Sequence, residues 1–155
     1  MFETILAGVT IFVLGQVFLK MVIDPVQKLK STLGEIAHAL VYYASVYGNP
    51  GSLPPERSQE AYERLRDLSS QLAGDLRVIP LFSITRFIFF LPARESLISA
   101  QREVIGLSNG VYSHGADGAM RNLRLSQKIA DALGILVPKH ERVSEELLDD
   151  VLAKK

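Results

Sequence analysis

The first 23 residues of the chain are almost uniformly hydrophobic. From Ile5 to Leu19 there is no charged side chain, and only Thr10 and Gln16 are clearly polar. With the apolar residues on either side, the run reaches about 20 residues, which is the length that crosses a hydrocarbon core of about 30 Å as a helix. The pattern therefore predicts a single transmembrane anchor over residues 1–23.

A cleaved signal peptide and the core helix of a soluble protein are the two alternatives for this run. A signal peptide begins with a basic segment, whereas Glu3 is the only charged side chain before Lys20, and no small-residue cleavage site stands out. Lys20, Lys28 and Lys30 all follow the run, and no Lys or Arg precedes it. The positive-inside rule then predicts a single-pass protein with its N-terminus outside and its C-terminal bulk in the cytoplasm.

A second amphipathic helix is expected directly after the anchor. Asp24 and Pro25 are typical of a helix start, which predicts a kink or break between the anchor and this helix. Apolar residues then recur at steps of three and four, which is the pattern of a coiled-coil seam and favours self-association. The seam consists of Val26, Leu29, Leu33, Ile36, Leu40, Tyr43 and Tyr47.

Three further helices are predicted over about 56–76, 92–112 and 119–133, the last ending at Gly134. A short amphipathic helix is expected to begin at Ser144, and no alternating strand pattern is found. The fold class is therefore all-α: one N-terminal transmembrane helix followed by a cytoplasmic bundle of four to five helices. The expected divisions are 1–23 for the anchor, 24–137 for the bundle and 138–155 for the C-terminal tail.

The segment 81–91 is apolar but too short to span a bilayer as a helix, and it carries Arg86 in its middle. It is either buried in the bundle or placed in the membrane interface beside the anchor. Burial is the favoured interpretation.

Composition excludes several classes of function. The 17 Lys and Arg balance the 17 Asp and Glu, so a strongly basic nucleic-acid binder is excluded, and the absence of Cys excludes disulfides and thiolate chemistry. No hydrolase or metalloprotease motif occurs among the three histidines and the serines. We therefore expect neither an enzyme nor a cofactor or metal site.

Two groups of residues are candidates for a site. Glu35, His38 and Tyr42 lie one helical turn apart in a stretch that is apolar nearly all round, so we expect a buried polar site, either a responsive one or a structural hydrogen bond. Arg121, Arg124 and Lys128 form a basic stripe that suits an anionic small molecule or lipid headgroups, or is an ordinary solvated face. The stretch from Ser126 to Ile135 resembles half of a helix-turn-helix, but the residues after it do not fit, so a nucleic-acid partner is not favoured.

Several short motifs resemble those of a family of short bacterial membrane-anchored helical proteins with no known activity. They are Glu35-Ile36-Ala37-His38, Tyr42-Tyr43-Ala44, Tyr47-Gly48-Asn49-Pro50-Gly51 and Gly106-Leu107-Ser108-Asn109. The resemblance implies a bacterial inner-membrane location and transfers no site residues.

These observations predict a non-enzymatic, membrane-tethered interaction or sensory module. The expected partners are the lipid bilayer and a second copy of the chain, with self-association through the helical bundle. The alternative is a ligand-gated membrane effector, in which the bundle binds an anionic signal such as a nucleotide and perturbs the bilayer.

Overall fold

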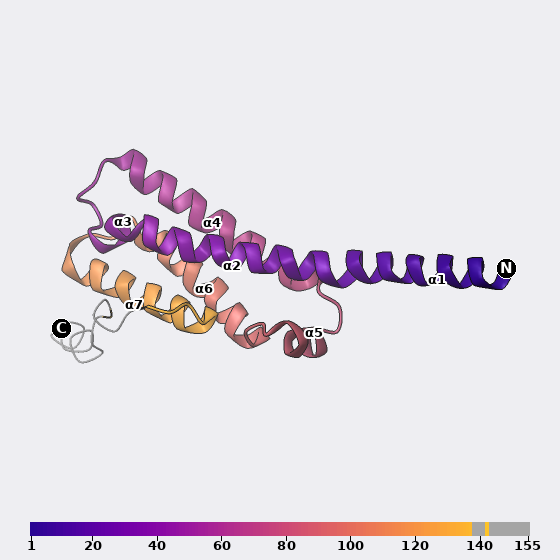
Figure 1. Cartoon of the computed structure of the whole chain (residues 1–155). Coiled ribbons are helices and arrows are strands. Elements are labelled where there is room, and N and C mark those ends of the chain that lie inside the picture. The colour runs from indigo at the N-terminus through magenta and orange to yellow at the C-terminus, as the bar shows by residue number, and fades with distance from the viewer. Residues whose placement is uncertain (138–141, 143–155) are drawn as a thin grey trace.

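The computed structural model describes residues 1–137 and 142, and within them the protein consists of helices joined by turns and loops, with no strand (Figure 1). The long helices are α1 (Phe2–Phe18), α2 (Asp24–Tyr42), α4 (Pro55–Val78), α6 (Arg94–Gly110) and α7 (Gly115–Leu133), and the short ones are α3 (Ala44–Gly48) and α5 (Phe82–Phe89). The all-α prediction is confirmed. The helix expected from Ser144 lies outside the described residues.

Helix α2 begins at Asp24 as predicted, but α1 runs into it without a break, so the predicted interruption between the anchor and this helix is wrong. A π-helical turn, η1 (Leu19–Ile23), joins the two, and the Asp24 N–H bonds to the Leu19 carbonyl five residues back. Pro25 has no N–H and its ring clashes with the carbonyl four residues earlier in a regular α-helix, and a π turn widens the helix at that point. Asp24 does not cap the helix but accepts a hydrogen bond from Lys20 Nζ at 2.9 Å.

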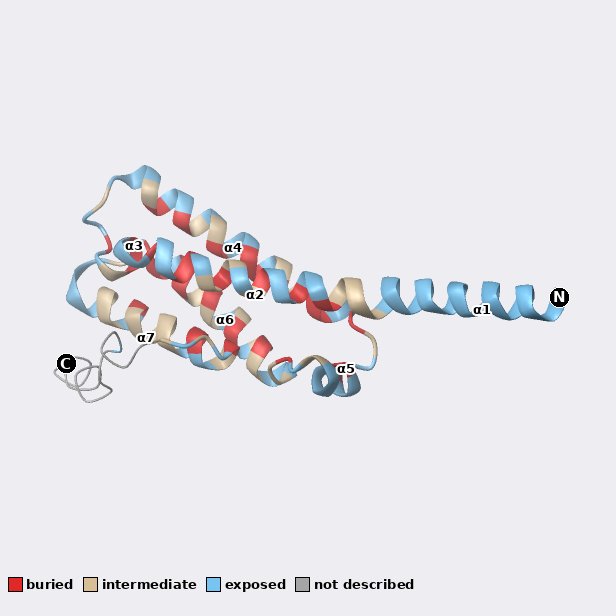
Figure 2. Cartoon of the chain, viewed as in Figure 1, coloured by how far each residue is buried: buried red, intermediate tan, exposed pale blue. Residues whose placement is uncertain are grey.

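The continuous helix Phe2–Tyr42 has two different halves. Every residue of α1 is exposed, whereas α2 buries one face in the bundle (Figure 2). This helix is also the one helix of the described residues that is long and apolar enough to cross a membrane.

The bundle core lies between α2, α4, α6 and α7 (Figures 1 and 2). Leu65 and Leu68 of α4 and Leu97 and Leu107 of α6 are completely buried, as the three-and-four spacing predicts. The seam that begins on α2 is buried too, except for the half-buried Leu33, because α2 packs against α4 within the same chain. This surface is therefore occupied inside one molecule and is not free for a second copy.

Helix α7 begins at Gly115, one turn earlier than the sequence predicts, and ends at Gly134 as expected. Gly134 adopts a left-handed conformation with φ of 69°, which a glycine reaches without steric cost and which closes the helix.

Helix α5 contradicts the expectation that segment 81–91 is buried. Phe82, Thr85 and Leu91 are buried and Phe89 is half-buried, but the other large apolar side chains are exposed; these are Leu81, Ile84, Phe87, Ile88 and Phe90. Its direction is set by Leu81 and Phe90, which flank it with φ of 46° and 54°, a left-handed conformation that is rare for bulky residues. Neither position carries the glycine or asparagine that would signal such a bend in the sequence.

Candidate functional site

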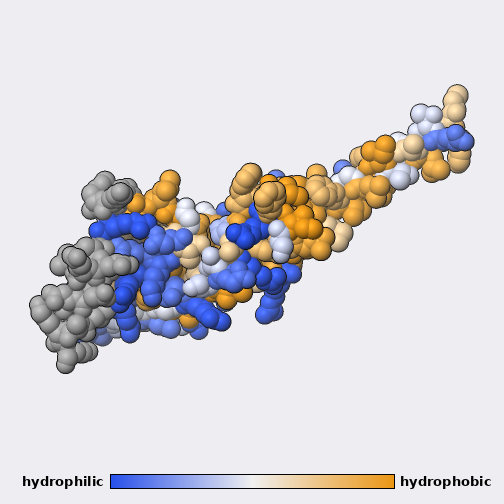
Figure 3. All heavy atoms as spheres, turned by 90° about the horizontal axis from the view of Figure 1, so that it is seen from below, coloured by the Kyte–Doolittle hydropathy of each residue, from blue (hydrophilic) through white to orange (hydrophobic). Residues whose placement is uncertain are grey.

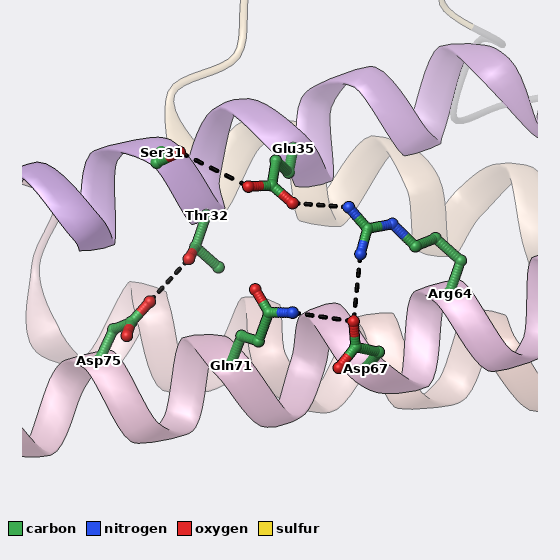
Figure 4. A network of polar contacts seen from close by, with 7 residues as sticks. All are labelled: Ser31, Thr32, Glu35, Arg64, Asp67, Gln71 and Asp75. Carbon is green, nitrogen blue, oxygen red and sulfur yellow. Dashed lines mark hydrogen bonds and ion pairs between the residues drawn. The ribbon is translucent and has the colours of Figure 1, made fainter.

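A polar network ties α2, the continuation of the anchor, to α4 (Figure 4). Glu35 Oε2 accepts a hydrogen bond from Arg64 Nη2 at 2.6 Å, and the same guanidinium donates to Asp67 at 3.1 Å. Glu35 and Arg64 are both about 40% exposed. The pair is therefore screened by water and contributes more to the alignment of the two helices than to stability.

Closer to the anchor, Asp75 of α4 forms the buried part of this network. It is 1% exposed, it accepts a hydrogen bond from Thr32 Oγ1 at 2.6 Å, and Lys28 Nζ lies 3.1 Å from its other oxygen. Lys28 itself reaches water, since its side chain is 70% exposed. A carboxylate buried to this degree is tolerated only when it is hydrogen-bonded or paired, and these two residues of α2 supply both interactions.

The sequence contains a signal for this buried pair, although neither residue belongs to a predicted site. Thr32 lies between Leu29 and Ile36, and Asp75 lies between Leu72 and Leu76, so each polar residue occupies a position of its helix that faces the core. A polar residue at such a position requires a partner, and here the two partners are each other.

The predicted site of Glu35, His38 and Tyr42 is not buried, because α2 lies at the edge of the bundle and only one of its faces is covered. Glu35 is half-exposed, and His38 and Tyr42 are exposed. The three residues also have different partners. Glu35 binds Arg64, whereas the His38 and Tyr42 rings stack with centroids 5.6 Å apart.

The far ends of α2 and α4 meet in a second cluster of polar and aromatic groups. The Arg57 guanidinium lies 5.3 Å from the centre of the Tyr42 ring and forms an ion pair of 3.0 Å with Glu60. The Tyr43 hydroxyl donates to Glu60 at 3.0 Å, and burial together with this carboxylate raises the pKa of the Tyr43 phenol. The cluster holds the end of α2 against α4 and places no nucleophile or base in a cleft.

Asn122 of α7 connects three helices at the same end of the bundle. It is completely buried, and its amide nitrogen donates to the carbonyls of Tyr47 at 3.0 Å and Gly110 at 2.8 Å, while its Oδ1 accepts no hydrogen bond. A Cβ on Gly110 would lie 1.9 Å from this oxygen, so the approach of α6 and α7 requires glycine there. Asn122 therefore has a structural role.

The basic stripe lies on the surface of α7. Arg121 donates to Ser113 Oγ at 3.2 Å, Arg124 is half-buried, and Lys128 is exposed. Residues 135–137, which follow the half helix-turn-helix, are not helical, and the position of its second helix lies outside the described residues. An apolar groove of about 290 Å³ runs between α2, α3 and α7, and is lined among others by Leu40, Ala44 and Leu123.

The described residues hold no group of three or more His, Asp or Glu side chains that would bind a metal ion. Comparison of the chain with protein-family models, with curated proteins and with solved structures finds no match.

Proposed function

We propose that this protein is a non-enzymatic, membrane-tethered interaction or sensory module of the bacterial inner membrane. The observation that carries the proposal is the continuous helix Phe2–Tyr42, of which one half is apolar and fully exposed and the other half belongs to the bundle core. An apolar helix of this length, which packs against none of the other described helices, requires an apolar environment.

The charges around the anchor support an orientation with the bundle in the cytoplasm. Lys20, Lys28 and Lys30 lie at the bundle end of the anchor, and Glu3 is the charged side chain at the other end. Positive residues close to the end of a membrane helix favour the cytoplasmic side.

The α2–α4 network supports the sensory part of the proposal. Because α1 and α2 are one helix, a rotation or displacement of the anchor moves α2 directly. Thr32 and Asp75, and further along Glu35 and Arg64, then transmit this movement to α4. The polar contacts fix the register between the two helices, which apolar side chains alone fix less well.

The proposal includes self-association of the chain. The contact surface is the anchor, because the α2 seam is occupied within the chain. Gly8 and Gly15 lie two helical turns apart on α1, and a Cβ added at either meets no atom within 4 Å. Small residues on one face of a membrane helix allow two copies to approach closely.

Carbonate extraction of bacterial membranes that contain the full chain tests the tether. A variant with both Val9→Lys and Val13→Lys places two charges near the middle of the span, each at a cost of about 2.5–3.5 kcal/mol. The matched control is Val41→Lys, since Val41 is 79% exposed but belongs to the bundle. We expect the wild type and the control to stay in the membrane pellet and the double variant to leave it. Release of the uncleaved, folded wild type would contradict the proposal.

A further inference from the structure

Helix α5 carries an apolar face that points away from the bundle. At 100° per residue, Leu81, Ile84, Phe87 and Ile88 fall within an arc of roughly 120°. Phe87 is 83% exposed, and Phe90, just after the helix, is 92% exposed. Phe82 and Thr85, on the other side of the helix, are buried against the bundle. The exposed face is therefore a continuous apolar surface and not a set of scattered side chains.

This surface lies at the end of the bundle from which the anchor emerges (Figure 1). Figure 3 shows the hydrophobic surface of the anchor continuing onto this end of the bundle, while the opposite end is mostly hydrophilic. The chain after α5 reaches α2 itself, because Phe90 and Leu91 line the same hollow as Lys30 and Leu33. An anchor that crosses the bilayer thus brings α5 to the level of the lipid headgroups.

The charges beside the apolar face have the sign that a phospholipid surface attracts. Arg86 and Arg94 line a hollow together with Leu81 and Ile84, with Glu95 as the acidic residue there. Arg94 also lies 5.9 Å from the centre of the Phe82 ring. Aromatic and aliphatic side chains flanked by cations are the composition of helices that lie in a membrane interface.

The backbone at both ends of α5 is held in a strained conformation. Leu81 and Phe90 both have positive φ, and Pro80 and Pro92 stand next to the segment. Such conformations are found where a structure directs a side chain to a particular place. Here they turn the apolar face outward instead of into the core.

We propose that α5 is a second membrane contact, which inserts its apolar face into the interface of the same bilayer that the anchor crosses. This inference rests on the proposed function, since the anchor sets the plane of the membrane. With the anchor and α5 both in the bilayer, the bundle is held against the membrane surface in one orientation.

Tryptophan fluorescence of the full chain in phosphatidylcholine–phosphatidylglycerol vesicles tests the proposal, because the chain has no tryptophan of its own. Phe87→Trp reports on α5 and Phe12→Trp on the middle of the anchor. Val41→Trp is the control, since Val41 is similarly exposed but lies about 25 Å along α2 from Asp24. Each variant is measured in vesicles whose lipids are brominated either high on the acyl chain or near its end.

For Phe87→Trp we expect blue-shifted emission and quenching mainly by bromine high on the chain, at an insertion depth of about 5–10 Å. For Phe12→Trp we expect quenching mainly by the deep bromine, and for Val41→Trp solvent-like emission without quenching. Solvent-like emission from Phe87→Trp, with Phe12→Trp quenched, would overturn the inference and leave the proposed function standing. Blue-shifted but unquenched emission from Phe87→Trp would overturn it in favour of a contact with a second copy of the chain. An unquenched Phe12→Trp variant would overturn both.

Discussion

Replacing Thr32 by valine keeps the shape of the side chain but removes the hydroxyl that donates a hydrogen bond to Asp75 across the α2–α4 interface. Both residues are buried, and the hydrogen bond of 2.6 Å is made to a carboxylate. Hydrogen bonds to charged groups contribute about 1.5–3 kcal/mol. The extra buried methyl group of valine stabilises the folded state by up to about 1 kcal/mol. We therefore expect Thr32→Val to lower the free energy of unfolding by about 1–2 kcal/mol.

The same substitution in an Asp75→Ala background separates this hydrogen bond from other effects of the valine. Without Asp75 the Thr32 hydroxyl is buried and has lost its acceptor, so its removal no longer costs stability. We expect Thr32→Val to be neutral or stabilising in this background, which corresponds to a coupling energy of about 2 kcal/mol between the two residues.

The assay is urea unfolding of the full chain in mild detergent, followed by far-UV circular dichroism. Ser31→Ala is the matched control, because Ser31 is the neighbouring hydroxyl but is exposed, and we expect it to change stability by less than about 0.5 kcal/mol. If Thr32→Val lowered the free energy of unfolding equally with and without Asp75, the reasoning that this pair joins the anchor helix to the bundle would be refuted.

Two further predictions concern the opposite end of the bundle. Gly110→Ala forces a Cβ onto buried Asn122, so we expect a loss of about 2 kcal/mol in thermal or urea unfolding. In an Asn122→Ala background the same change should be neutral or stabilising, and a loss in both backgrounds would contradict this contact. Burial raises the pKa of the Tyr47 phenol above 10.0, so the folded state retains this proton where the unfolded state loses it. The free energy of unfolding should therefore fall as pH rises above 10.0, and Tyr47→Phe should make that fall shallower; parallel pH profiles would count against this assignment.

The sequence predicts the helices and their buried faces because apolar spacing records which side of each helix meets the core. The leucines of α4 and α6 are buried as this spacing requires, and so is the seam of α2 apart from the half-buried Leu33. The apolar spacing does not indicate how many sides of a helix other helices cover. His38 lies among small and apolar residues and is nevertheless exposed, because none of the described helices covers its side of α2.

The partners in the candidate site depend on contacts between residues far apart in the chain. Glu35 pairs with Arg64 and Thr32 with Asp75 only because α2 and α4 meet at one particular register. The outward direction of α5 depends on positive φ at Leu81 and Phe90, which their residue types do not indicate. These features require the assembled backbone, whereas the anchor is evident from hydropathy alone.

The placement of the chain across the membrane is tested most directly by labelling single cysteines, since the chain has none of its own. Intact bacterial spheroplasts that carry Glu3→Cys or Ser70→Cys are treated with a membrane-impermeant maleimide. The account predicts labelling of the Glu3→Cys variant in intact cells, and labelling of the Ser70→Cys variant, on exposed α4, only after the membrane is opened. Labelling of Ser70→Cys in intact cells would contradict it.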